Sequence, residues 1–280
     1  MPPPQWSPPP SAPPQWAPPP SAPPPWAPPP EAPPPASDGI TAKGLPLSQR
    51  GGVFLDGAGL SSPGVQVGTL DFLAKIPIRP HTFVDAILPL GFVNIIGAGF
   101  SGSLVGLGNP MMGVHHVLAP SDRTWLTLGG AFGFPLVTTY DGFSAARAVW
   151  DFQEFAVTTV PFALRAAFET HMSFIEMRAQ LEPIFGISHR SGVDHLFGVQ
   201  HAFEVQAGHQ IGGGLRYQGM VFGTKAIGND QYQGAFELFF RLYHDPLLLR
   251  LGLLLPVDKP LGQAFDNTWG FKVMTGWTLD

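Results

Sequence analysis

Apolar and polar residues alternate along most of the chain from about residue 52 onward, and this alternation limits the fold more than any other feature. In GAFELFFRLYH, Phe or Leu occupies every second position from Phe236 to Leu242, and the residues between them include Glu237 and Arg241. Successive side chains of a β-strand point to opposite faces, so the pattern predicts strands with one apolar and one polar face. We expect twelve strands, near residues 51–57, 65–76, 81–92, 110–119, 123–136, 158–168, 173–185, 195–206, 209–222, 232–243, 246–256 and 268–279.

The gaps between these segments alternate between long and short. Working back from the C-terminus, the long gaps are VDKPLGQAFDN, GTKAIGNDQ, GISHRSGVD, residues 137–157 and residues 93–109, and the short gaps are HDP, AG, ETHM, PSD and PIRP. Up-and-down outer-membrane barrels have short periplasmic turns, longer outer loops and an even number of strands. The sequence therefore predicts an all-β fold, namely an up-and-down antiparallel transmembrane β-barrel of about 12 strands. We expect it in the bacterial outer membrane, with both chain ends in the periplasm.

Composition is consistent with a membrane barrel. Charged residues make up 12% of the chain, which is low, yet no run of eighteen apolar residues predicts a transmembrane helix. The formal net charge of −5 argues against a nucleic-acid partner. With no cysteine, disulfide and thiolate chemistry are excluded. The first residues, Met-Pro-Pro-Pro, have neither a basic nor an apolar region, so no signal peptide is expected in them.

The charges of the expected strands fall on the polar faces alone. This agrees with a barrel in lipid, because a charge at the bilayer midplane costs roughly 2–4 kcal/mol. His201 is the one conspicuous polar residue on an apolar face. These charged residues could act in transport, or they could merely neutralise one another inside a narrow lumen. The residues predicted to line the lumen are Asp71, Lys75, Asp85, Arg165, Glu176, Arg178, Glu182, Glu204, Arg216, Glu237, Arg241, Arg250 and Lys272.

Aromatic residues lie near the ends of several expected strands. Trp125, Tyr243 and Trp277 fall at predicted periplasmic ends, and Tyr232 and Trp269 at predicted outer ends. Trp and Tyr are enriched at both membrane–water interfaces. We therefore expect these five residues to contribute to interfacial girdles that contact membrane lipid.

The N-terminal residues 1–38 form a separate, proline-rich segment. QWSPPPSAPP, QWAPPPSAPP and PWAPPPEAPP repeat every ten residues. Proline at this density favours polyproline II, so we expect a disordered tail ahead of a barrel domain at 51–280. A stiff spacer is one interpretation, and a ligand for a periplasmic or cell-wall partner is the other.

The stretch NIIGAGFSG contains the spacing G-x-G-x-x-G at Gly97, Gly99 and Gly102, which also occurs in dinucleotide-binding turns. Such a site needs a helix directly after the glycines. Glycines and a proline follow within two turns, however, and they would break that helix. We therefore expect a glycine-rich outer loop between the third and fourth strands, and no cofactor.

The same region continues as GLGNPMMG, from Gly106 to Gly113. This G-x-G-N-P-x-x-G segment resembles outer-membrane barrels of the phenol meta-cleavage-pathway transporter type. The resemblance implies a channel or transporter for small molecules, with hydrophobic or aromatic compounds among its solutes.

Catalytic and metal sites are not expected. His115 and His116 are adjacent, so in a strand they face opposite sides, and the other histidines are scattered. Ser188 and His189 are neighbours, which does not make a catalytic triad, although an outer-membrane hydrolase stays an alternative. The loop 137–157 has helical spacing of apolar groups and could narrow the pore. A structural or tethering barrel without transport and a soluble β protein are the further alternatives.

Overall fold

The computed structural model describes residues 47–97, 100–137, 159–188, 195–223, 232–257 and 268–279. The chain divides into a unit of residues 1–39 and a unit of residues 40–280. The predicted proline-rich tail and nearly all of the predicted loop 137–157 lie outside the described residues.

Strands make up nearly all of the described chain. Twelve of them agree in place with the alternating segments, although β1 and β3 each continue five residues beyond their predicted ends. The elements are η1 (Leu47–Gln49), β1 (Gly51–Ser62), β2 (Val65–Arg79), β3 (Thr82–Gly97), β4 (Phe100–Leu107), β5 (Met111–Ser121), β6 (Thr124–Gly133), β7 (Thr159–Met172), β8 (Ile175–Ser188), β9 (Leu196–Gly208), β10 (Ile211–Phe222), β11 (Tyr232–His244), β12 (Leu247–Pro256) and β13 (Trp269–Leu279). No helix among the described residues has the length and apolar character needed to cross a membrane.

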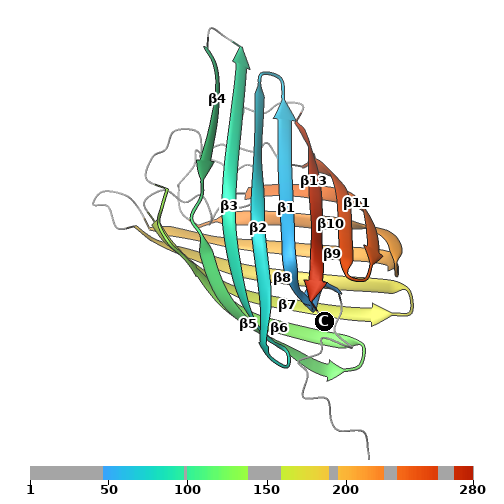
Figure 1. The fold of residues 1–280 in the computed structure, drawn as a ribbon. Helices are drawn as coiled ribbons and strands as arrows, with labels where there is room; N and C mark the ends of the chain where they lie inside the picture. Colours follow the sequence, from blue (N-terminus) through green and yellow to red (C-terminus); the bar gives the residue numbers. More distant parts are fainter. Residues whose placement is uncertain are drawn as a thin grey trace, which may run out of the picture. The chain divides into compact units, whose positions relative to one another are not determined.

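The strands close into an antiparallel barrel (Figure 1). Closure joins the first strand to the last, since Gly51 of β1 pairs with Leu279 of β13. Thirteen strands occupy twelve places, because β4 and β5 pair with different halves of β3. The predicted 12-stranded up-and-down barrel is therefore confirmed.

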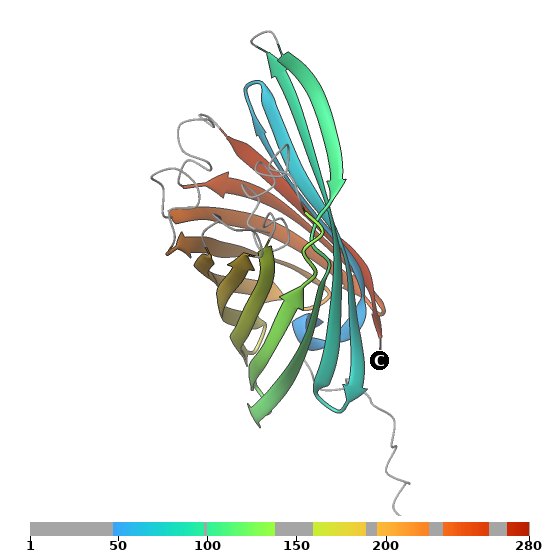
Figure 2. The same cartoon turned by 90° about the vertical axis from the view of Figure 1, so that its left-hand side faces the viewer.

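The predicted outer loop at 93–109 is wrong, because β3 extends to Gly97 and β4 begins at Phe100. β3 and β4 form a hairpin, in which Leu90 pairs with Leu107 and Gly97 pairs with Phe100. Figure 2 shows that this hairpin extends past the neighbouring strands. Gly97 and Gly102 thus lie in β3 and β4, and the described residues that follow, from Phe100 to Leu107, form a strand. The helix that a dinucleotide-binding turn needs at this point is replaced by β4.

The segment Gly106–Gly113, which carries the family resemblance, joins β4 to β5. The Gly108 amide donates to the Pro89 carbonyl (2.8 Å), and the Phe134 amide donates to the Pro110 carbonyl (2.9 Å). The fully buried side chain of Asn109 accepts a hydrogen bond from the Val137 amide (3.0 Å). The segment therefore fixes the point at which β4 leaves the wall that β5 and β6 continue.

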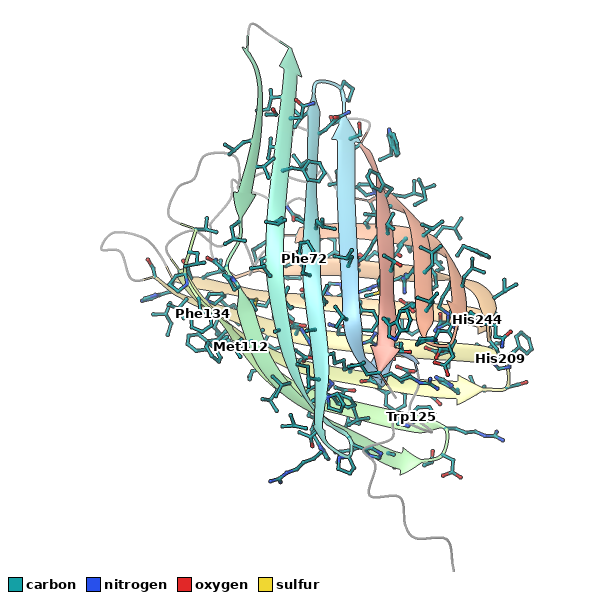
Figure 3. All side chains as sticks on the ribbon, viewed as in Figure 1. Phe72, Met112, Trp125, Phe134, His209 and His244 are labelled. Atoms are coloured by element: carbon teal, nitrogen blue, oxygen red, sulfur yellow. The ribbon has the colours of Figure 1, made fainter. Side chains whose placement is uncertain are left out.

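The two faces of the strands differ as the alternation predicts. On β11, Leu238 and Phe240 are 59% and 44% exposed, whereas Glu237 and Arg241 are 0% and 8% exposed. Figure 3 shows side chains projecting outward around the barrel. The exposed apolar side chains form the surface that would contact lipid.

The expected aromatic girdle needs a correction. Trp269 and Trp277 are 52% and 55% exposed on the outer face. Trp125, in contrast, is 5% exposed and packs against Phe83 and Val117 inside the barrel.

Tyr243 also turns inward, where its hydroxyl accepts a hydrogen bond from Arg50 (2.9 Å). The sequence already indicates an inward position for both residues, because each shares its strand face with a polar residue. Trp125 shares its face with Thr127, and Tyr243 shares its face with Arg241.

Candidate functional site

The barrel encloses a cavity of about 250 Å³. Ten of the charged residues predicted to line the lumen contribute to it: Lys75, Asp85, Arg165, Glu176, Arg178, Glu204, Arg216, Arg241, Arg250 and Lys272. Glu182 instead lines a small adjoining cavity with Asp85 and Arg165. Asp71 and Glu237 are inward-facing but buried in the wall, at 7% and 0% exposure, and do not line the cavity.

Arg250 of β12 binds two buried carboxylates at once. Its Nη1 lies 2.9 Å from Glu204 Oε2, and its Nε lies 2.9 Å from Glu237 Oε1. Its guanidinium carbon also lies 3.6 Å from the centre of the Phe239 ring. Charge-assisted hydrogen bonds and the ring face together hold this side chain in one position.

The pairing register sets Glu204 of β9 between two other arginines. Arg178 on β8 and Arg216 on β10 are its direct cross-strand partners. Glu204 is nevertheless bound by Arg250, and neither Arg178 nor Arg216 makes a hydrogen bond or ion pair with any described residue. Both arginines bury Nε without a partner among the described residues, while their side chains line the cavity. Within the described part of the chain, these are the cavity arginines that make no hydrogen bond or ion pair.

The strands opposite β8–β10 add apolar side chains to the cavity lining, beside the charged Asp56, Lys75 and Asp85. Phe54 of β1 pairs in register with Leu73 of β2, which pairs in turn with Ile87 of β3. Phe54 also pairs with Gly276 of β13, where a Cβ atom would lie 2.3 Å from the Phe54 ring. A Cβ at Gly52 would lie 2.5 Å from the same ring. These two glycines let the ring of Phe54 lie against the wall.

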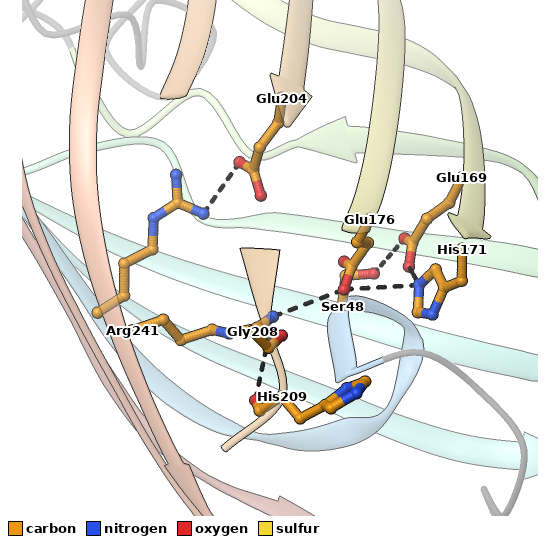
Figure 4. A network of polar contacts seen from close by, with 9 residues as sticks. Ser48, Glu169, His171, Glu176, Glu204, Gly208, His209 and Arg241 are labelled. Atoms are coloured by element: carbon orange, nitrogen blue, oxygen red, sulfur yellow. Dashed lines mark hydrogen bonds and ion pairs between the residues drawn. The ribbon is translucent and has the colours of Figure 1, made fainter. Parts of the chain in front are cut away.

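The segment from η1 to β1 lines the cavity with Ser48, Gln49 and Arg50, at the end of the barrel where β1 begins and β13 ends. Ser48 Oγ donates a hydrogen bond to Glu169 Oε2, and Lys75 Nζ donates to the Ser48 carbonyl at 3.1 Å. The neighbouring Gln49 is 1% exposed. In Figure 4 Ser48 lies opposite Glu169, with His171 and Glu176 beside them. We call residues 47–50 the inner strap.

Glu169, His171 and Glu176 bring three candidate metal-ligand atoms within 4.8 Å of one another. His171 Nε2 lies 3.0 Å from Glu169 and 3.5 Å from Glu176. Ser48 already binds Glu169, however, and Arg241 lies 3.7 Å from Glu176. The cluster is therefore bound by other side chains of the protein.

The adjacent residues His115 and His116 point to opposite faces of β5, as the sequence predicts. His115 is 4% exposed and its Nδ1 lies 2.6 Å from Asp85, whereas His116 faces the other side and contacts Thr82. Of the Ser188–His189 pair, only Ser188 is among the described residues.

Sequence reasoning missed several inward residues of the site. Asp56, which pairs with Lys272 at 3.1 Å, lies just before the predicted end of the first strand. Glu169 was assigned to a turn, but β7 continues through it to Met172. Continued alternation in β7 was the available signal, because Glu169 shares its face with Arg165 and Ala167.

Comparisons with solved structures find outer-membrane barrels. The NanC porin aligns with a TM-score of 0.55 and 7% identity, over 81% of this chain and 100% of that chain. The COG4313 outer membrane channel from Pseudomonas putida F1 aligns with a TM-score of 0.58 and 13% identity, over 84% of this chain and 99% of that chain. No protein-family profile and no curated protein sequence matches this chain. The chain thus has the fold of an outer-membrane barrel.

Proposed function

We propose that this protein is a bacterial outer-membrane channel or transporter for a small solute. The carrying observation is a closed barrel that is apolar outside and charged inside, with a cavity of about 250 Å³ lined by ten of the predicted lumen residues. A barrel built only for stability would fill its interior with packed side chains. Membrane lipid is the proposed partner of the outer face, and the proposed activity is passage without catalysis.

Two similarities support this proposal. The structures that share the fold are described as a porin and an outer membrane channel. The segment Gly106–Gly113 resembles transporters of the phenol meta-cleavage-pathway type. On this basis we assign small molecules, including aromatic ones, as the solute class.

A structural or tethering barrel is the second candidate, and the inner strap favours it. Residues 47–50 lie across one end of the lumen and are bound to Glu169, Lys75 and Tyr243. The proline-rich repeats precede this strap in the chain, and we propose that they reach a periplasmic or cell-wall partner. A barrel held closed in this way would anchor a tail and conduct nothing.

Conductance in a planar lipid bilayer separates the two candidates. The full chain and a variant without residues 1–49 are reconstituted after heat-modifiable migration has shown that both are folded. We expect discrete conductance steps from the shortened variant, with smaller or rarer steps from the full chain. A folded barrel that conducts in neither form would contradict the channel and support the tethering role.

A further inference from the structure

We propose that the cavity binds a small carboxylate with a flat apolar body. The carboxylate is held by Arg178 and Arg216, and the body lies against Phe54 and its neighbours. This inference rests on the proposed channel function and specifies the solute of the same cavity.

The first step concerns charge. Eight cationic residues line the cavity, namely Arg50, Lys75, Arg165, Arg178, Arg216, Arg241, Arg250 and Lys272, against four carboxylates, Asp56, Asp85, Glu176 and Glu204. Further carboxylates, among them Glu169 and Glu237 at 0% exposure, are buried in the wall, where a solute does not meet them. The buried carboxylates still offset the cationic charge, but the cavity surface itself presents more cationic than anionic side chains to a solute.

The second step concerns which cations are available. Glu204 and Glu237, which the register places beside Arg178 and Arg216, make their ion pairs with Arg250 instead. In each of these two arginines Nε is buried, whereas the terminal Nη nitrogens remain accessible from the cavity. A guanidinium presents a planar fork that matches a carboxylate in two parallel hydrogen bonds. A carboxylate group satisfies donors that no described residue of the protein satisfies.

The third step concerns the apolar wall. Phe54, Leu73 and Ile87 form one continuous row across three strands, and Leu248 continues it beyond Gly276. All four side chains line the same cavity as the arginines. The ring of Phe54 lies over Gly52 and Gly276, and the row as a whole offers an apolar surface against which another ring can pack.

Size sets the remaining limit. A cavity of about 250 Å³ lies just below the range of roughly 300–1,000 Å³ that is typical of drug-sized ligands. One ring with one carboxylate suits that space. A neutral aromatic molecule would leave both arginines unpaired, and acetate would leave the apolar wall uncovered.

The test is calorimetric titration of the full chain in detergent with benzoate, acetate and benzyl alcohol as separate probes. We expect benzoate to bind at least tenfold more tightly than either of the other two. Arg178→Gln with Arg216→Gln should weaken benzoate binding at least tenfold and leave benzyl alcohol unchanged. Phe54→Leu should weaken benzoate and leave acetate unchanged. Arg79→Gln, at an exposed arginine outside the cavity, is the matched control and should change nothing.

Each contrary outcome has a distinct meaning. Equal affinity for benzoate and benzyl alcohol would overturn the role of the arginines, and equal affinity for benzoate and acetate would overturn the apolar wall. No benzoate binding to a barrel that conducts would overturn this inference while the channel function stands. Benzoate binding to a barrel that never conducts would leave the site in place and contradict transport instead.

Discussion

The Ser48 hydroxyl donates a hydrogen bond to the carboxylate of Glu169, which follows 121 residues later in the chain. This contact ties the segment before the first strand to the inner face of β7. Lys75 and Tyr243 hold the same strap from two other strands. The lumen is therefore narrowed by the chain's own N-terminal approach to the barrel.

Removing the hydrogen bond between Ser48 and Glu169 should let the inner strap move away from the lumen. We expect Ser48→Ala to raise the fraction of time spent in the higher-conductance state about tenfold, because a hydrogen bond to a charged group contributes about 1.5–3 kcal/mol. Single-channel recording in a planar bilayer measures that fraction. Ser121→Ala removes a hydroxyl from a turn at the rim and is the control. Identical recordings from Ser48→Ala and the unmodified chain would count against a gating strap.

The outer face should reject charge in a depth-dependent way. Leu238→Arg, in the middle of β11, should reduce folding stability by about 2–4 kcal/mol, because the guanidinium would enter the hydrocarbon midplane. Leu247→Arg, at the first residue of β12 and opposite His244 at the end of β11, should cost about 1 kcal/mol or less. Both leucines are exposed, at 59% and 53%, so the pair is matched in burial. Urea titration in lipid vesicles measures both, and equal costs would refute the assignment of a lipid-facing belt.

Arg250 should matter more than other lumen cations. Arg250→Gln leaves Glu204 and Glu237 without their partner in a buried setting, and removal of one member of a buried pair costs about 3–5 kcal/mol.

Lys272→Gln serves as the comparison, since the Lys272–Asp56 pair lies 3.1 Å apart and is more exposed. We expect a smaller loss there. Unfolding in urea should therefore occur at a clearly lower concentration for Arg250→Gln than for Lys272→Gln. The reverse order would mean that Arg250 is not the organising cation of the lumen.

Topology can be tested with single cysteines, because the natural sequence has none. We expect Pro63→Cys, in the turn between β1 and β2, to react with a membrane-impermeant maleimide on whole cells. His209→Cys, in the turn between β9 and β10 at the other end, should react only after the outer membrane is permeabilised. His209 is preferable to Gly208, whose φ of +102° disfavours a side chain. Labelling in the opposite pattern would invert the predicted orientation.

Local alternation was sufficient to predict the strands and most of their faces. Glu237 and Leu238 show why, since neighbouring strand residues must face opposite sides whatever the rest of the chain does. The same rule would have placed Trp125 and Tyr243 inside, but proximity to strand ends suggested a girdle instead. The rule is weakest at FSGSLVGL, where small residues blur the alternation, so the sequence predicts a loop in place of β4.

Tertiary structure alone decided which charges pair and which stay available. Alternation along the sequence predicts that seven cationic and six anionic strand residues share the inner face, because period-two side-chain direction is a local property of the backbone. It did not determine that Arg250, rather than Arg178 or Arg216, would bind Glu204, since Arg250 and Glu204 are 46 residues apart. Their contact depends on barrel closure and on the inward reach of one side chain from β12. Ser48 meets Glu169 for the same reason, because closing the barrel brings distant strands around one lumen.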